Sequence, residues 1–290
     1  MNYSNPQYLT STEQLASMLD NEADKLRIFD VNVTLVPRET GYAPVSGIDE
    51  YLKAHIPGAA FIDLMNDFSD KNSDFGFTLP SSALLESSFR TAGIGNENKV
   101  VIYSSGHMMW ATRFWWMLYS CGHRNVSVLD GGFAKWQLEG WPVTSQENQY
   151  ANGDFSVELD SKRWADKAAV IAAIGDADVC TINALSPGVY SGEAEMNYGR
   201  KGHIENSKNV FYGDLLDEGC FRPADNLRTI FQDKGVLAKP QVISYCGGGI
   251  SATIDALGLA LIGYENVAIY DGSMGEWVRD KDLPLILGAD

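Results

Sequence analysis

The stretch Val242-Ile243-Ser244-Tyr245-Cys246-Gly247-Gly248-Gly249-Ile250-Ser251-Ala252-Thr253 joins two kinds of sequence. It begins with β-leaning apolar residues, passes through a cysteine and three glycines, and then becomes compatible with a helix. This order predicts a strand, a tight loop and a helix. Cys246 would then lie at the N-terminal end of a helix, where unpaired amides and a partial positive charge favour a thiolate. Because glycine has no Cβ, the loop is expected to curl around the sulfur as a ring of amide donors.

A buried, unreactive cysteine beside a glycine-rich turn would give the same local pattern, because free cysteines are commonly buried. The rest of the chain decides between the two interpretations. It has 290 residues, of which 45% are hydrophobic and 21% charged, enough for two globular domains. No apolar run approaches the roughly 20 residues needed to span a bilayer. The start, Met1-Asn2-Tyr3-Ser4-Asn5-Pro6, lacks the basic and apolar regions of a signal peptide, so we expect a cytoplasmic protein.

Cysteine spacing and net charge exclude several classes of function. The four cysteines, Cys121, Cys180, Cys220 and Cys246, are widely spaced and form no Cys-x-x-Cys motif. A disulfide framework and a zinc site are therefore not expected, and we predict no metal. The net charge of -16 argues against partners such as nucleic acid or an anionic membrane surface.

The chain contains an internal repeat that spacing makes visible. Five landmarks pair between the halves: Gly93 with Gly235, Ser104 with Cys246, Gly122 with Gly263, Asp130 with Asp271, and Trp136 with Trp277. The first interval is 11 residues in both halves, and the last is 6 in both. From Ser104 or Cys246 the next glycine follows after 18 or 17 residues and the aspartate after 26 or 25. This agreement indicates two copies of one α/β unit.

Strands and helices alternate in both copies, which predicts an α/β fold with two tandem domains. Each domain should be a mostly parallel sheet covered by helices on both faces, with ligands at the carboxyl ends of the strands. We predict a non-catalytic domain over residues 1–145, a polar linker over 146–160 and a catalytic domain over 161–290. The second domain is expected to open with a helix from Trp164 to Ile174.

Several motifs together resemble the two-domain rhodanese family, which includes thiosulfate and 3-mercaptopyruvate sulfurtransferases. The first half resembles the family's inactive copy, and the second half its active copy. The motifs are His55-Ile56-Pro57-Gly58-Ala59, Val128-Leu129-Asp130-Gly131-Gly132, Tyr190-Ser191-Gly192-Glu193, Tyr198-Gly199-Arg200-Lys201-Gly202-His203-Ile204, and the six-residue loop from Cys246 to Ser251. The resemblance implies two rhodanese-like domains over nearly the whole chain.

The resemblance also implies a reaction. Cys246 would take a sulfane sulfur from a small anionic donor, 3-mercaptopyruvate or thiosulfate, and become a persulfide. It would then pass the sulfur to a thiol, cyanide or a protein acceptor, which splits one transfer into two steps. The family implies no cofactor. It also implies that loop amides hold the persulfide, here those of Gly247, Gly248, Gly249, Ile250, Ser251 and Ala252.

Departures from the family's motifs bear on the donor. Gly247 and Gly248 replace the basic pair of the thiosulfate branch, and Gly248 also lacks the hydroxyl of the mercaptopyruvate branch. The usual aspartate before Ser-Pro is Asn183 here. Arg200 matches an arginine that binds donor anions in related proteins, where its guanidinium could hold a carboxylate; the alternative is a solvated surface arginine.

His55 matches a histidine discussed as an active-site member in the mercaptopyruvate branch, but we favour a turn histidine that bonds the backbone. Ser104 stands where Cys246 stands in the other copy, and we expect it to be inert.

Two competing functions remain to be weighed. A tyrosine-phosphatase-like or arsenate-reductase-like enzyme would need an arginine at position 252, which is Ala252. A low-activity persulfide carrier, or a regulatory or interaction module on a drifted rhodanese scaffold, is the other alternative.

Overall fold

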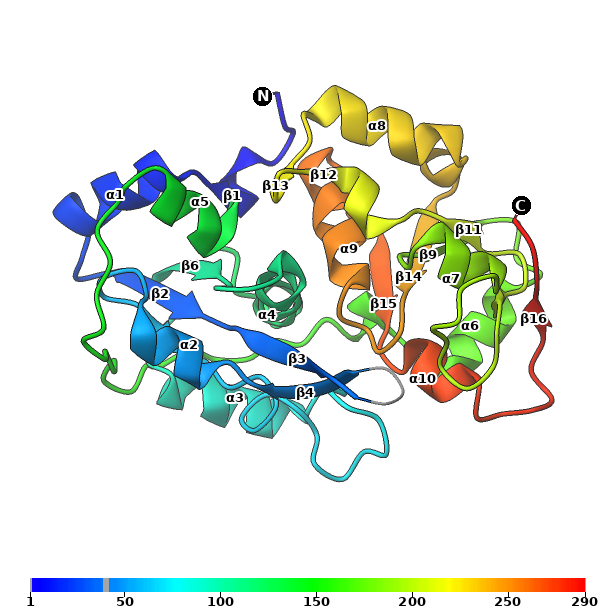
Figure 1. Ribbon diagram of the computed structural model, residues 1–290, viewed down its shortest axis with the longest axis horizontal. Coiled ribbons are helices and arrows are strands. Elements are labelled where there is room, and N and C mark those ends of the chain that lie inside the picture. Colours follow the sequence, from blue (N-terminus) through cyan, green and yellow to red (C-terminus); the bar gives the residue numbers. More distant parts are fainter. Residues whose placement is uncertain (1, 39–41, 290) are drawn as a thin grey trace.

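Two parallel sheets, one in each half of the chain, form the frame of the computed structural model (Figure 1). The structure describes residues 2–38 and 42–289. Within these residues each main sheet has five strands, and every pairing in both sheets is parallel. The predicted α/β class with two similar halves is therefore confirmed.

The elements of the first half run from residue 6 to residue 138. Its strands are β1 (Leu9–Thr10), β2 (Leu26–Asp30), β3 (Val33–Pro37), β4 (Tyr42–Ser46), β5 (Ala60–Phe61), β6 (Lys99–Tyr103) and β7 (Val126–Leu129). Its helices are the 3-10 turn η1 (Pro6–Tyr8) and α1 (Thr12–Asn21), α2 (Ile48–Lys53), α3 (Ser82–Thr91), α4 (Met108–Ser120) and α5 (Gly132–Leu138). β3 and β4 pair with each other as an antiparallel hairpin apart from the main sheet.

The elements of the second half run from residue 161 to residue 286. Its strands are β8 (Trp164–Ala165), β9 (Val179–Asn183), β10 (His203–Ile204), β11 (Lys208–Asn209), β12 (Leu216–Asp217), β13 (Cys220–Phe221), β14 (Gln241–Tyr245), β15 (Val267–Tyr270) and β16 (Leu285–Ile286). Its helices are α6 (Lys167–Ala173), α7 (Pro187–Ser191), α8 (Ala224–Asp233), α9 (Ala252–Leu261) and α10 (Ser273–Trp277), with 3-10 turns η2 (Ser161–Arg163), η3 (Tyr212–Leu215) and η4 (Val236–Ala238).

The two sheets have the same strand order. The first sheet runs β1-β7-β6-β2-β5, and the second, read in the same sense, runs β8-β15-β14-β9-β11. β14, which leads into Cys246, corresponds to β6, which leads into Ser104. The repeat seen in the spacing of the sequence is thus a repeat of topology.

Both faces of the first sheet are buried. Alternate residues of a strand point to opposite faces, so the residues of one strand report on both. In β6, Val101 and Tyr103 belong to an apolar cluster with side chains of α1 and α5. Val100 and Ile102 instead pack in a second cluster that includes side chains of α3 and α4. The helices therefore cover both faces, as predicted.

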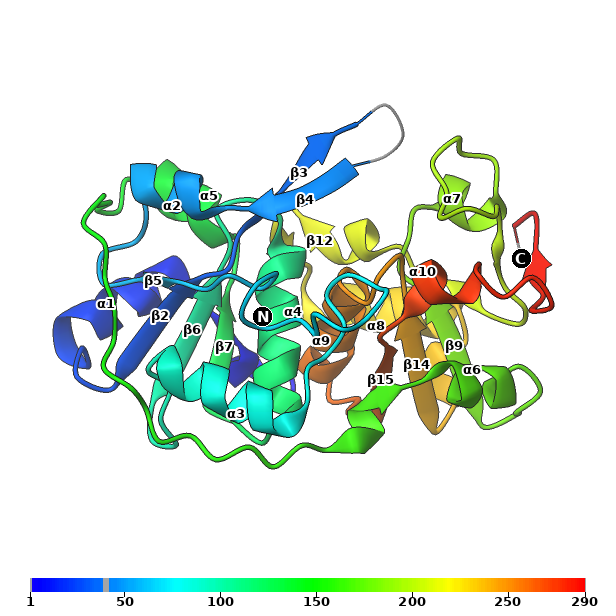
Figure 2. The same cartoon turned by 90° about the horizontal axis from the view of Figure 1, so that it is seen from below.

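One apolar core joins the halves. The cluster that contains Trp115 and Trp116 of α4 continues into Ile254 and Leu257 of α9 without interruption. The two helices lie side by side at the centre of the molecule (Figure 2). Burial of this kind is the main favourable term in association, so it holds the two halves together.

The connecting segment, predicted as a linker over 146–160, follows the surface of the first half without helix or strand. Its backbone is bonded along its length: Gly153 N donates to Arg90 O, Phe155 N to Ile94 O, and Asp160 N to Ser120 O. These hydrogen bonds hold the connecting segment against the first half along a defined path. The domain boundaries themselves stay a prediction.

The predicted helix from Trp164 to Ile174 is wrong at its start. Trp164 and Ala165 form β8, and α6 begins only at Lys167. Asp166 separates the two elements because its side chain accepts the N–H of Ala169, as an N-cap residue does.

Candidate active site

Cys246 lies directly after β14 and six residues before the first residue of α9. Cys246 is only 1% exposed, so its thiol is buried beneath neighbouring residues. The predicted order of strand, tight loop and helix is confirmed at this point.

Ser273 fastens the loop from behind. Its Oγ accepts N–H groups from Cys246, at 3.1 Å, and from Gly249, at 3.0 Å, and donates to Tyr270 O at 2.7 Å. The next residue, Met274, donates its N–H to Cys246 O at 3.0 Å. The start of α10 therefore sets the path of the loop backbone.

Gly249 is the glycine that the loop needs most. Its φ is +72°, a left-handed conformation that a side chain would strain. A Cβ at this position would also lie 2.7 Å from the backbone oxygen of Asp271. Its amide donates to Ser273 Oγ. The expectation that this amide holds the persulfide stays a prediction, and it requires the N–H to be shared with the sulfur or released from Ser273.

The other predicted amide donors lie where the loop turns into the helix. Ile250 O accepts the N–H of Thr253 at 3.0 Å and its hydroxyl at 2.6 Å, which closes the first turn of α9. Gly247, Gly248, Ile250, Ser251 and Ala252 remain predicted donors to the sulfur. All five lie in the stretch from the end of β14 to the first residue of α9.

Two tyrosines that sequence reasoning missed are close to this loop: Tyr198 contacts it, and Tyr212 is near enough to feel the charge of Cys246. A Cβ on Gly247 would overlap the hydroxyl and ring of Tyr198, so the tyrosine takes the space of the missing side chain. Burial raises the pKa of Tyr198 and of Tyr212, and in both the negative charge of a Cys246 thiolate raises it further. Both phenols are therefore protonated at neutral pH and can donate hydrogen bonds. The sequence signal that could have indicated Tyr198 is its place two residues before Arg200 in the same motif.

Arg200 is engaged by the C-terminal segment. Nη1 donates to Asp280 O at 2.9 Å and Nη2 to Leu283 O at 3.0 Å. The side chain is thus neither a solvated surface group nor bonded to the Cys246 loop in this state. Its role in donor binding stays a prediction, and it requires these two bonds to be exchanged.

His55 and its counterpart His203 have the same backbone-bonded environment. His55 stacks on Tyr51 with 3.9 Å between ring centroids, and its Nδ1 lies 2.6 Å from Tyr51 O. His203 stacks on Tyr190 at 3.7 Å, and its Nδ1 lies 2.9 Å from Tyr190 O. Both rings are buried, which agrees with the turn role favoured for His55.

Ser104 occupies the loop of the first half that corresponds to the Cys246 loop. Its Oγ donates to Asn32 Oδ1 at 3.2 Å and accepts the N–H of Gly106 at 3.1 Å. A small cavity of about 170 Å³ lies beside it, lined in part by Glu218. The hydroxyl is therefore used in fixing its own loop.

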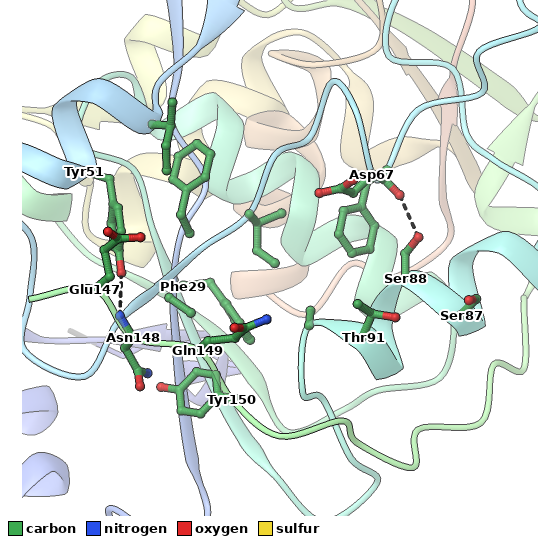
Figure 3. Close-up of a pocket in the computed structure, with 16 residues that line it drawn as sticks. Phe29, Tyr51, Asp67, Ser87, Ser88, Thr91, Glu147, Asn148, Gln149 and Tyr150 are labelled. Atoms are coloured by element: carbon green, nitrogen blue, oxygen red, sulfur yellow. Dashed lines mark hydrogen bonds between the residues drawn. The ribbon is translucent and has the colours of Figure 1, made fainter.

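A larger cavity of about 770 Å³ lies elsewhere in the first half (Figure 3). Phe29 and Tyr150 line it, and Asp67 and Glu147 add carboxylates. It shares no described lining residue with the Cys246 loop.

Over residues 2–38 and 42–289, no group of three or more metal-ligating side chains lies close enough together to hold a metal ion. The same residues contain no helix long and apolar enough to cross a membrane.

A family model described as a rhodanese-like domain matches residues 11–139 and 186–280. The chain belongs to the rhodanese-like family. The second match contains the whole loop from Cys246 to Ser251, and the first contains Ser104 and the loop around it. The resemblance inferred from the motifs is confirmed.

Named relatives of this rhodanese-like chain are sulfurtransferases. It is 35% identical to a thiosulfate sulfurtransferase of Cricetulus griseus, over 79% of this chain and 78% of the relative. It is 32% identical to a 3-mercaptopyruvate sulfurtransferase of Escherichia coli, over 81% of this chain and 84% of the relative. A probable 3-mercaptopyruvate sulfurtransferase of Pseudomonas aeruginosa is 32% identical over 97% of this chain and 98% of the relative. The predicted class, a sulfurtransferase enzyme, is confirmed.

Solved structures agree. The crystal structure of SseA from Escherichia coli, a 3-mercaptopyruvate sulfotransferase with the rhodanese fold, has a TM-score of 0.80 and 28% identity and covers 92% of this chain and 98% of its own. EanB in complex with ergothioneine has a TM-score of 0.86 at 18% identity and covers 100% of this chain and 72% of its own. This second likeness concerns the fold alone.

Proposed function

We propose that this rhodanese-like sulfurtransferase carries its sulfur on Cys246. The observation that supports this most directly is the placement of a thiol between a strand end and a helix N-terminus, in a loop of glycines. Amides and the helix dipole at such a place stabilise an anion, and a persulfide is one. The serine at the equivalent place in the first half offers no thiol, so one of the two copies carries the chemistry.

The reaction balances without a cofactor. The Cys246 thiolate attacks the sulfur of 3-mercaptopyruvate, an S–S bond forms, and the C–S bond breaks with its electron pair going to carbon. The resulting enolate takes a proton and leaves as pyruvate. With thiosulfate the S–S bond of the donor breaks instead and sulfite leaves. The persulfide then gives its outer sulfur to a thiol, cyanide or a protein acceptor, which restores the thiolate.

The donor pocket is proposed to be walled by Tyr198, Tyr212 and Arg200. The two phenols can donate hydrogen bonds to a carboxylate, a carbonyl or the persulfide itself. Arg200 lies two residues beyond Tyr198 and is the nearest guanidinium in sequence to this wall. It would supply the cation that the glycines at positions 247 and 248 lack.

A slow persulfide carrier is the second candidate, and one observation favours it. Cys246 is only 1% exposed, with Tyr198 packed over Gly247 beside it. An acceptor as large as a protein would need this wall to move before it could reach the sulfur. A carrier would accept one sulfur and release it slowly, whereas an enzyme would turn over. The expected cytoplasmic location remains part of the proposal.

One experiment tests the function. The protein is incubated separately with 3-mercaptopyruvate and with thiosulfate, and the peptide that contains Cys246 is examined by mass spectrometry without reductant. We expect a mass gain of one sulfur that cyanide or a thiol removes, together with multiple turnovers. One sulfur per chain without turnover would favour the carrier. A gain on Cys121, Cys180 or Cys220 in place of Cys246 would refute the assignment.

A further inference from the structure

Arg113 brings a charge from the first half into the core beside the Cys246 loop. It belongs to α4, and its side chain is 1% exposed. Nη1 lies 2.7 Å from Oδ1 of Asp271 and donates to the backbone oxygen of Gly249 at 3.1 Å. Nη2 donates to the backbone oxygen of Phe77 at 2.6 Å. One guanidinium thus joins a first-half segment to the loop that carries the thiol.

The contact with Gly249 matters because this residue is held on both sides. Its N–H donates to Ser273 Oγ, and the same oxygen accepts the N–H of Cys246. Its carbonyl accepts from Arg113. Since the φ of Gly249 is +72°, this residue also makes the sharp bend of the loop. A change at its carbonyl would therefore reach the backbone of Cys246 through one shared hydroxyl.

Asp271 is the second residue near the Cys246 loop that the first half contacts. Its Oδ1 pairs with Arg113, and its Oδ2 accepts the N–H of Leu79 at 2.6 Å. Asp271 lies between β15 and Ser273, so its position fixes the start of α10 behind the loop. A guanidinium can serve Asp271, Gly249 and Phe77 together because its donors form a rigid planar fork, whereas a lysine ammonium is a single point.

We propose that Arg113 is a positioning residue for the sulfur-carrying loop. The half of the chain without a reactive thiol then sets the geometry of Cys246 through the carbonyl of Gly249 and the carboxylate of Asp271. This inference rests on the proposed sulfur transfer at Cys246. It gives the first half a part in the rate of the reaction, beyond adding to stability.

Arg113→Lys tests the proposal, because it keeps the buried charge and removes the fork. The measurement is the single-turnover rate at which Cys246 gains a sulfur from 3-mercaptopyruvate, per titrated Cys246 thiol, over a range of donor concentrations and pH. We expect a tenfold or greater fall in the rate at saturating donor, with less than a twofold change in the concentration for half-maximal rate. We also expect the pH dependence of the rate to shift. A merely structural arginine would change the folded fraction and leave these per-site values alone.

The matched control is Asp130→Asn. Asp130 is the aspartate of the first half that corresponds to Asp271, and its Oδ1 accepts the N–H of Phe221 at 2.9 Å across the interface between the halves. We expect its per-site rate to stay within twofold of wild type. If Arg113→Lys folds and keeps a wild-type rate, the proposal is wrong. If it does not fold, Asp271→Asn replaces it, and a wild-type rate in that variant overturns the proposal equally. Failure of the wild-type protein to gain sulfur would instead refute the proposed function.

Discussion

Asp130 and Asp271 occupy equivalent positions in the two halves, and each carboxylate accepts a backbone N–H from the other half. Phe221 N donates to Asp130 Oδ1 at 2.9 Å, and Leu79 N donates to Asp271 Oδ2 at 2.6 Å. The exchange is reciprocal, as expected for two copies of one unit packed around an approximate two-fold axis. The copies differ in charge: Asp271 pairs with buried Arg113, whereas burial raises the pKa of Asp130.

The first prediction concerns the thiol itself. Cys246→Ser is expected to lower sulfur transfer to the enzyme-free background, because a hydroxyl is a far weaker nucleophile and forms no persulfide. The fold should survive, since the serine keeps the backbone bonds to Ser273 and Met274. Steady-state assay of cyanolysis and thermal unfolding check both statements. Turnover above background would mean that another group carries the sulfur.

The second prediction concerns the equivalent serine. Ser104→Ala is expected to leave kcat/KM within about twofold of wild type, because its hydroxyl bonds Asn32, which follows β2, and Gly106 of its own loop, both in the first half. Steady-state kinetics with each donor would check this. A tenfold loss, about 1.4 kcal/mol of transition-state stabilisation, would show that the Ser104 loop takes part in the chemistry.

The sequence predicted what depends on local order or on spacing. The strand, loop and helix around Cys246 follow from a run of apolar residues, three glycines and a helical continuation. The repeat follows from intervals that insertions have left almost unchanged. Both are properties of neighbouring residues or of counts along one chain, and neither requires knowledge of how the halves pack.

What the sequence could not predict depends on contacts between distant segments. Arg113 reads as one polar residue in an aromatic helix, and nothing near it in sequence indicates Gly249 or Asp271. Tyr198 lies in a stretch between α7 and β10 without helix or strand, so its approach to Gly247 is set by tertiary packing. For Arg200 the motif gave the residue type but not the direction of the side chain, which here turns to the C-terminal segment.

The third prediction concerns the contact of Gly247 with Tyr198. Gly247→Ala is expected to lower kcat/KM by roughly tenfold, because the added methyl displaces the tyrosine from the wall of the pocket. Gly248→Ala adds the same methyl where nothing lies within 4 Å, so the difference between the two variants measures the Tyr198 contact.

The Tyr198 contact can also be tested in a double-mutant cycle. In a Tyr198→Ala background the cost of Gly247→Ala should shrink, since the methyl then has room. Equal costs in the two backgrounds would contradict the placement of Tyr198 against the loop.

The fourth prediction is a pH dependence of stability. Asp30 is buried at the end of β2, where it accepts the N–H and the hydroxyl of Ser105. Burial raises its pKa to about 7. The folded state therefore holds a proton that the unfolded state has lost, and this carboxyl makes stability fall as pH rises from about 4 to about 7. The fall is at most about 1.4 kcal/mol per pH unit.

Asp30→Asn replaces the titratable carboxyl by an amide that does not titrate in this pH range. Relative to wild type, the variant should gain stability as pH rises through the same window and keep a constant advantage above it. Urea unfolding at a series of pH values from about 4 to about 8.5 measures the difference. A difference that does not vary with pH would show that Asp30 titrates at an ordinary value.

The last prediction concerns the donor. Thiosulfate is a compact dianion, and the positions where basic side chains would meet it are Gly247 and Gly248. The proposed wall offers neutral phenols and one guanidinium, in a chain of net charge -16. A guanidinium can hold a single carboxylate through two parallel bonds, whereas it neutralises only part of a dianion. We therefore expect a higher kcat/KM for 3-mercaptopyruvate than for thiosulfate in side-by-side kinetics, and a clear preference for thiosulfate would contradict this pocket.

Arg200→Ala should then raise KM for the preferred donor several-fold and change kcat less, which is the pattern of lost uniform binding. Lys201→Ala is the matched control, because this neighbouring cation is exposed and pairs loosely with Glu195 at 3.8 Å. Since Arg200 also bonds Asp280 O and Leu283 O, the melting temperature is measured alongside. A fall in melting temperature with an unchanged KM would assign Arg200 to the C-terminal segment alone and leave the two tyrosines as the donor wall.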